Sequence, residues 1–209
     1  MEKLNKIYEK IHVSYFAFIG LIIFFIGLIP AILVETDFDF FVTHASYLGT
    51  PSNDLHLLFN VCWFITGVFM IFFLLGFTLY LQEKGLDTKQ TWLAFIFSVC
   101  SAIGILGMAI FDTDTAHAPH YIFELVFFFA GIIYLFSYAY IEWKSSDFPK
   151  FQAILNLIVA FFFILYLVLL IVNRVADDIL PEAQSFTEWL FLFANLFWFL
   201  ENGIYILKK

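Results

Sequence analysis

Six long apolar runs constrain what this chain can fold into more than any other feature of its sequence. We place them near residues 12–34, 55–81, 91–111, 120–142, 153–173 and 187–207. Each has about 20 residues or more, enough for a helix to cross a roughly 30 Å hydrocarbon layer. Only helices satisfy their own backbone there, and the runs are too few and too long for a barrel. The sequence therefore predicts an all-α polytopic integral membrane protein, a bundle of six transmembrane helices forming one domain over residues 1–209.

The composition excludes a soluble domain. Of the 209 residues, 63% are hydrophobic and 13% are charged, whereas a soluble domain has about a quarter charged residues. An apolar excess of this size cannot be hidden in a core, so lipid must be the main solvent. Cys62 and Cys100 both lie inside apolar runs, and they indicate neither a disulfide framework nor a zinc motif.

Basic residues fall almost entirely on one side of the six-span topology. Nine lysines lie on the side that holds both termini, and Arg174 is the single basic residue on the other side. Because cytoplasmic segments of membrane proteins are enriched in basic residues, we expect both termini in the cytoplasm and a multi-pass protein of the plasma membrane. The outer side carries eleven acids and a net charge of −10. This charge favours cations, so we expect no nucleic-acid partner.

The last apolar run is preceded by residues typical of a helix start. Ser185 and Glu188 have the spacing of a capping box, which predicts that the sixth helix begins near residue 187. Trp189 then falls at the membrane boundary, where tryptophan is enriched.

The third run carries a stripe of small residues, which predicts close packing against a neighbouring helix. Gly104 and Gly107 lie beside this stripe. The stripe ends at Asp112, which either points into the bundle or remains a solvated acid at a helix end. Its members are Ala94, Ser98, Ser101, Ala102, Ile105, Ala109 and Asp112.

A polar stretch between the third and fourth runs is the first candidate for chemistry. Asp112, Asp114, His117 and His120 are carboxylate and imidazole residues that could hold a divalent metal such as zinc and activate water for hydrolysis. The spacing matches no strong motif, however. A cluster without metal would instead serve as a pH-sensitive switch or an acid/base pair. In an enzyme, we expect Asp112, His120 and Ser46 to be the catalytic residues.

Further polar residues are expected around that stretch, in a pocket at the outer ends of the second, third and fourth helices and the first loop. Glu124 lies about one turn below the boundary and requires a partner, for which His117, His120 and Arg174 are candidates. The expected pocket residues are His44, His56, Asn60 and Glu124.

Short motifs spread along the chain resemble a known family. They are Ser46-Tyr47-Leu48-Gly49, Leu58-Phe59-Asn60, Gly67, Gly104, Gly107, Phe111-Asp112 and His120. Together they resemble the prokaryotic membrane family called "domain of unknown function 998", over about residues 10–207. The resemblance implies a polytopic fold with Ser46, Asn60, Asp112 and His120 at motif positions. His117 and Glu124 look like local additions, and Ile110-Phe111 replaces the usual proline.

The family is distantly similar to the Frag1/DRAM/Sfk1 group and has been compared with a hydrolase superfamily, and neither comparison fixes an activity. We expect the pocket to serve lipid binding or a metal-assisted hydrolysis of a lipid or amide, with membrane lipids as partners. The alternative is a non-enzymatic structural or regulatory subunit that packs against other membrane proteins. A transporter is disfavoured because Glu201 has no evident charged partner within the membrane.

The topology can be tested by cysteine labelling in a variant whose Cys62 and Cys100 are replaced by alanine. We expect Asp177→Cys to react with an impermeant maleimide on intact cells, and Ser145→Cys to react only after permeabilisation. Reaction of both cysteines from the same side would contradict six alternating spans.

Overall fold

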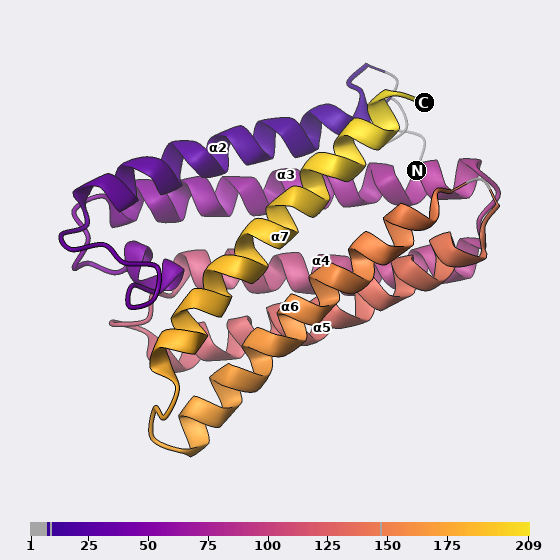
Figure 1. Cartoon of the computed structure of the whole chain (residues 1–209). Helices are drawn as coiled ribbons and strands as arrows, with labels where there is room; N and C mark the ends of the chain where they lie inside the picture. Colours follow the sequence, from indigo (N-terminus) through magenta and orange to yellow (C-terminus); the bar gives the residue numbers. More distant parts are fainter. Residues whose placement is uncertain (1–7, 9, 147) are drawn as a thin grey trace.

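The structure, a computed structural model, describes residues 8, 10–146 and 148–209, and these contain helices and no strand. Six long helices follow one another, with the short 3₁₀ helix η1 between the first two (Figure 1). All six are long and apolar enough to cross a membrane, which confirms the all-α six-span prediction. Their bounds are α2 Val13–Val34, η1 Ala45–Gly49, α3 His56–Glu83, α4 Thr88–Ile110, α5 His117–Lys144, α6 Lys150–Val175 and α7 Pro181–Leu207.

Each helix packs against its neighbour in the chain, and α7 returns to pack against α2. The described part of the chain therefore forms a closed ring of antiparallel helices, with α7 running obliquely across the bundle (Figure 1). Because the number of spans is even, the start of α2 and the end of α7 lie at the same end of the bundle. The η1 segment and the α4–α5 and α6–α7 connections lie at the opposite end.

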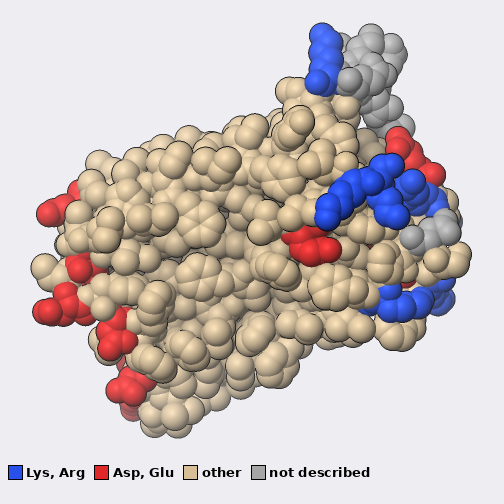
Figure 2. Space-filling model, turned by 45° about the horizontal axis from the view of Figure 1, so that its top comes forward, with Lys and Arg blue, Asp and Glu red and all other residues tan. Residues whose placement is uncertain are grey.

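Charged side chains gather at the two ends of the bundle, with an uncharged band between them (Figure 2). We call the end that holds η1 the acidic end and the end that holds the chain termini the lysine end. The band between them is rich in exposed apolar side chains, such as Ile22, Ile96 and Phe129. Such a band suits contact with hydrocarbon.

The small residues of α4 let α5 approach closely, as the stripe predicts. A Cβ atom added to Gly104 would lie 2.7 Å from both the Phe123 carbonyl oxygen and the Phe127 amide nitrogen. The Ser101 hydroxyl donates a hydrogen bond of 2.9 Å to the Phe127 carbonyl. Backbone thus lies against backbone, which is the packing that small residues permit between membrane helices.

The predicted start of the sixth helix is wrong. Helix α7 begins at Pro181, a residue that favours the first turn because it has no N–H to leave unpaired. Ser185 and Glu188 therefore lie inside the helix and do not form its cap. Trp189 is buried, with 1% of its surface exposed, so its side chain faces the bundle and not lipid.

The α4–α5 contact predicts a difference between two glycines. We expect Gly104→Ala to destabilise the protein by about 1–3 kcal/mol, because the new methyl group overpacks a rigid backbone contact. Gly20→Ala is the matched control: its Cβ would lie 3.1 Å from the Phe69 Cβ, with the movable Met70 methyl 3.3 Å away. Thermal unfolding in detergent measures both variants, and equal midpoints would contradict the packing argument.

Candidate functional site at the acidic end

A pocket of about 420 Å³ opens at the acidic end. It is enclosed by η1, the start of α5, the end of α6 and the start of α7. A chamber of about 30 Å³ adjoins it and shares Ser46, His120 and Glu124 with it. The other walls of the chamber are mainly apolar, and Asn60 and Glu188 also line it. The larger pocket is lined by His44, Ser46, Tyr47, Thr113, Asp114, His117, His120, Tyr121, Glu124, Tyr166, Leu170, Arg174, Asp178, Pro181 and Gln184.

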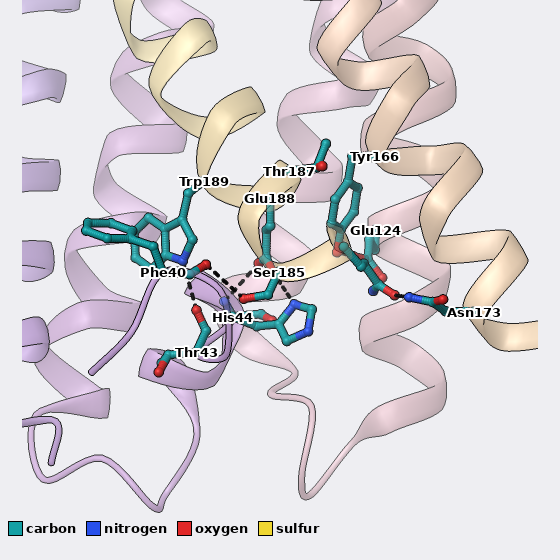
Figure 3. A network of polar contacts seen from close by, with 12 residues as sticks. Phe40, Thr43, His44, Glu124, Tyr166, Asn173, Ser185, Thr187, Glu188 and Trp189 are labelled. Atoms are coloured by element: carbon teal, nitrogen blue, oxygen red, sulfur yellow. Dashed lines mark hydrogen bonds and ion pairs between the residues drawn. The ribbon is translucent and has the colours of Figure 1, made fainter. Parts of the chain in front are cut away.

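The segment between α2 and α3 is held against α7 (Figure 3). This places His44 and Ser46 in the pocket. The indole N–H of Trp189 donates to the Thr43 carbonyl at 2.8 Å. The Ser185 hydroxyl donates to the Phe40 carbonyl at 3.3 Å. The ring of Phe40 also lies edge-on against Trp189, with centroids 5.2 Å apart. These contacts explain why Trp189 is buried.

The carboxylate of Glu188, on α7, makes polar contacts with two residues of the segment between α2 and α3. Its Oε2 lies 2.6 Å from His44 Nδ1, and its Oε1 accepts the Ser46 backbone N–H at 3.0 Å (Figure 3). The side chains of His44 and Glu188 are 15% and 6% exposed. Burial works against the charged imidazole, but the hydrogen bond and charge of Glu188 outweigh it, so the pKa of His44 is raised above its ordinary value of 6.5.

Glu124 has a different partner from those that the sequence suggests. Tyr166 of α6 donates its hydroxyl to Glu124 Oε1 at 2.7 Å, and both side chains are buried. Arg174 instead contacts His117, with Nη1 and Nε2 2.8 Å apart, and lies over the ring of Tyr121. The pocket therefore has a buried carboxyl group on one wall and an exposed guanidinium group on another.

The remaining predicted pocket residues have backbone partners. His120 is buried, and its Nδ1 lies 2.6 Å from the Phe111 carbonyl oxygen. Nδ1 therefore carries the hydrogen, and Nε2 is left as the acceptor. Asn60 donates to the Gly49 carbonyl at 2.8 Å. His56 Nδ1 lies 2.8 Å from the Asn53 carbonyl oxygen, and His56 lines neither cavity.

The Asp112 carboxylate holds its own loop. Its Oδ1 accepts the backbone N–H groups of Asp114 and Thr115, and its Oδ2 accepts the Thr115 hydroxyl. Burial disfavours the charged form slightly, but these hydrogen bonds prevail and lower the pKa of Asp112. Asp112 lines neither cavity, whereas Asp114 and His117 line the larger one.

Three of the four predicted metal ligands, Asp114, His117 and His120, line the larger pocket, but they are not arranged as a metal site. Among the described residues, no group of three or more histidine, cysteine, aspartate or glutamate side chains is arranged to hold a metal ion. Asp112 is engaged in its turn, and His120 Nδ1 is engaged with the backbone.

Sequence reasoning missed Glu188 and Tyr166 as site residues. The capping-box spacing assigns Glu188 to a helix cap. Glu188 is also flanked by an apolar run, however, and an acid in such a place needs a partner. The sequence signal that matches Glu188 is His44, an imidazole in the first loop for which no partner is predicted. Tyr166 lies within the uniformly apolar fifth run and gives no comparable signal.

These features define the class of protein: a six-helix membrane protein with a polar pocket at one end of its bundle. A family model described as "Protein of unknown function (DUF998)" matches residues 18–200, and the chain belongs to this family. The matched range includes every residue of the pocket. No curated protein and no solved structure matches the chain.

The His44–Glu188 pair predicts a pH-dependent stability. Because the pKa of His44 is raised, the pair stabilises the fold below about pH 6.5, and its charged contribution is lost as pH rises through the folded-state pKa. We expect Glu188→Gln to cost about 1.5–3 kcal/mol at low pH, the usual worth of a charged hydrogen bond, and less at higher pH.

Thermal midpoints of the wild-type protein and the Glu188→Gln variant, measured between pH 5 and 9, provide the test. The gap should narrow as pH rises. The same comparison in a His44→Gln background should give a gap that does not vary with pH. A gap that widens with pH in the wild-type background would refute the assignment.

Proposed function

We propose that this protein binds the zwitterionic head group of a membrane phospholipid in the acidic-end pocket. The observation that carries the proposal is the pairing, in one pocket, of a buried carboxyl group at Glu124 with an exposed guanidinium group at Arg174. A head group with an ammonium pole and a phosphate pole matches these two groups. The pocket volume of about 420 Å³ falls in the usual range for small-ligand sites, about 300–1,000 Å³.

The position of the pocket supports a ligand that comes from the membrane. Its walls are the ends of helices that are long and apolar enough to cross a membrane, so we expect it at the depth of the head groups. The adjoining chamber of about 30 Å³ is too small for an acyl chain. The acyl chains would therefore remain in the bilayer while the head group enters the pocket.

The chemistry of the walls supports the same ligand. An ammonium group donates hydrogen bonds to carboxylates, and Glu124 lies at the buried side with Tyr166 as its partner. A guanidinium group has five N–H donors in a geometry that suits phosphate, and one nitrogen of Arg174 contacts His117. The surplus of acids at this end disfavours a purely anionic head group.

Native mass spectrometry of the purified protein with added lipids tests the proposal. We expect phosphatidylethanolamine to be retained in preference to phosphatidylglycerol, and Glu124→Gln to weaken that retention about tenfold, a loss of about 1.4 kcal/mol. Asp54→Asn makes the equivalent change at an exposed acid outside the pocket and should leave retention unchanged. Equal retention of the two lipids, or equal effects of the two substitutions, would count against a head-group site.

A second candidate function, ester or amide hydrolysis, is favoured by one observation. Glu188 holds His44 through Nδ1 and holds the Ser46 backbone through its other oxygen. This leaves His44 Nε2 as a base, as in catalytic triads. In such a reaction, Ser46 Oγ attacks the carbonyl carbon and its proton passes to Nε2 and then to the leaving group. Water then cleaves the acyl-serine.

A fluorophosphonate probe tests this candidate without a known substrate. We expect the wild-type protein to be labelled at Ser46, and labelling to be lost in Ser46→Ala and to fall at least about tenfold in His44→Gln, within the range of general-base effects. Ser52→Ala, an exposed serine in the same segment, is the matched control. An unlabelled wild-type protein would remove hydrolysis by Ser46 from consideration.

A further inference from the structure

A second polar cluster is buried at the lysine end, on the faces that α5, α6 and α7 turn toward one another. We call Glu142, Gln152, Asn156, Trp198 and Glu201 the lysine-end cluster. Asn156 Nδ2 donates to Glu142 Oε2 at 2.7 Å, and Gln152 Nε2 donates to Glu201 Oε1 at 2.8 Å. The Trp198 indole donates to Asn156 Oδ1 at 2.7 Å. Since Gln152 and Asn156 are one turn apart on α6, these bonds join both glutamates to one network.

Acceptor atoms in this cluster outnumber donors. Three buried oxygen atoms have no hydrogen-bond partner: Glu142 Oε1, Gln152 Oε1 and Glu201 Oε2. Glu142 and Gln152 are 0% and 2% exposed. A buried polar atom without a partner costs about 1–3 kcal/mol, and such atoms are rare in native proteins. Three of them in one cluster indicate a missing positive group that they share.

The charge of the cluster leads to the same conclusion. The ion pair that the described residues form is His44–Glu188, at the opposite end. Neither Glu142 nor Glu201 therefore has a described basic side chain at ion-pair distance. Lys208 acts on Glu201 only at longer range, and Glu201 acts on Glu142 as a like charge. Glu142 is fully buried and Glu201 is half-buried, and both carboxylates need compensation, because desolvation of an unpaired charge is expensive.

We propose that the lysine-end cluster binds a sodium ion through Glu142 Oε1, Gln152 Oε1 and Glu201 Oε2. All three are hard oxygen ligands, which suit hard cations over zinc or copper. A proton bridges two oxygen atoms at a time, whereas a single cation can contact all three. Calcium takes about 6–8 oxygen ligands, and the charge of Lys208 further favours a monovalent ion.

Such an ion would join α5, α6 and α7 at the end opposite the pocket. Glu142 lies near the end of α5, Gln152 near the start of α6, and Glu201 about two turns before the end of α7. The ion would therefore lie just below the lysine end. This site is independent of head-group binding, because it shares no residue with the acidic-end pocket.

Equilibrium binding of radioactive sodium to the full-length protein in detergent tests the proposal directly. We expect saturable binding of one ion per chain in buffer balanced with N-methyl-D-glucamine chloride. Glu201→Gln should weaken it at least about tenfold, since even changes beyond the direct ligands of a metal cost about 10–100-fold. Glu83→Gln, an exposed acid at the same end, should leave binding unchanged.

Thermal midpoints of the wild-type protein give a second measurement, which does not require any variant to fold. Sodium should raise the wild-type midpoint with its concentration, as linkage requires for a ligand of the folded state. A midpoint that responds to pH but not to sodium would overturn the proposal in favour of a proton. Displacement of sodium by calcium at much lower concentration would overturn it in favour of a divalent site.

Discussion

The buried carboxylate of Glu188 is the interaction on which the acidic end depends. Its two oxygens engage the His44 side chain and the Ser46 backbone, so one group on α7 orders a segment 142 or more residues earlier in the chain. Trp189 supports the same contact through Thr43. Because this segment forms a wall of the pocket, the position of Ser46 in the pocket follows from a carboxylate that must be compensated once it is buried.

The parts of the fold that could be predicted from the sequence are those that local properties determine. Hydrophobic run length gives the six spans, and the small residues around Gly104 give the α4–α5 contact. Pairings between distant residues could not be predicted. Glu188 with His44 and Glu124 with Tyr166 join residues 144 and 42 positions apart, and a single sequence carries no record of such contacts. The predicted start of α7 is wrong because the spacing of a capping box also occurs inside helices, where the same side chains make tertiary contacts.

The two polar regions handle buried charge in different ways. At the acidic end, the His44 imidazole pairs with Glu188, and the Tyr166 hydroxyl donates a hydrogen bond to Glu124. At the lysine end, the side-chain amides of Gln152 and Asn156 donate hydrogen bonds to the glutamates, and three acceptor oxygens have no partner. Between the two regions the core consists largely of packed rings, including Phe73, Phe77 and Tyr138. The sequence disfavours a transporter because Glu201 has no evident charged partner. In the structure, Glu201 acts on Glu142 as a like charge.

The close approach of α4 and α5 has a mechanical consequence. The backbone and ring of Phe123 occupy the space where Gly104 and Gly107 would carry side chains. A shift of α4 by one residue would bring Ile103 or Ile105 against that surface, so the two helices cannot slide past each other in small steps. We therefore expect α4 and α5 to move together. Widening of the pocket mouth would therefore leave α4 and α5 together and move another wall, such as the segment between α2 and α3, which hydrogen bonds, ring contacts and the His44–Glu188 ion pair hold to α7.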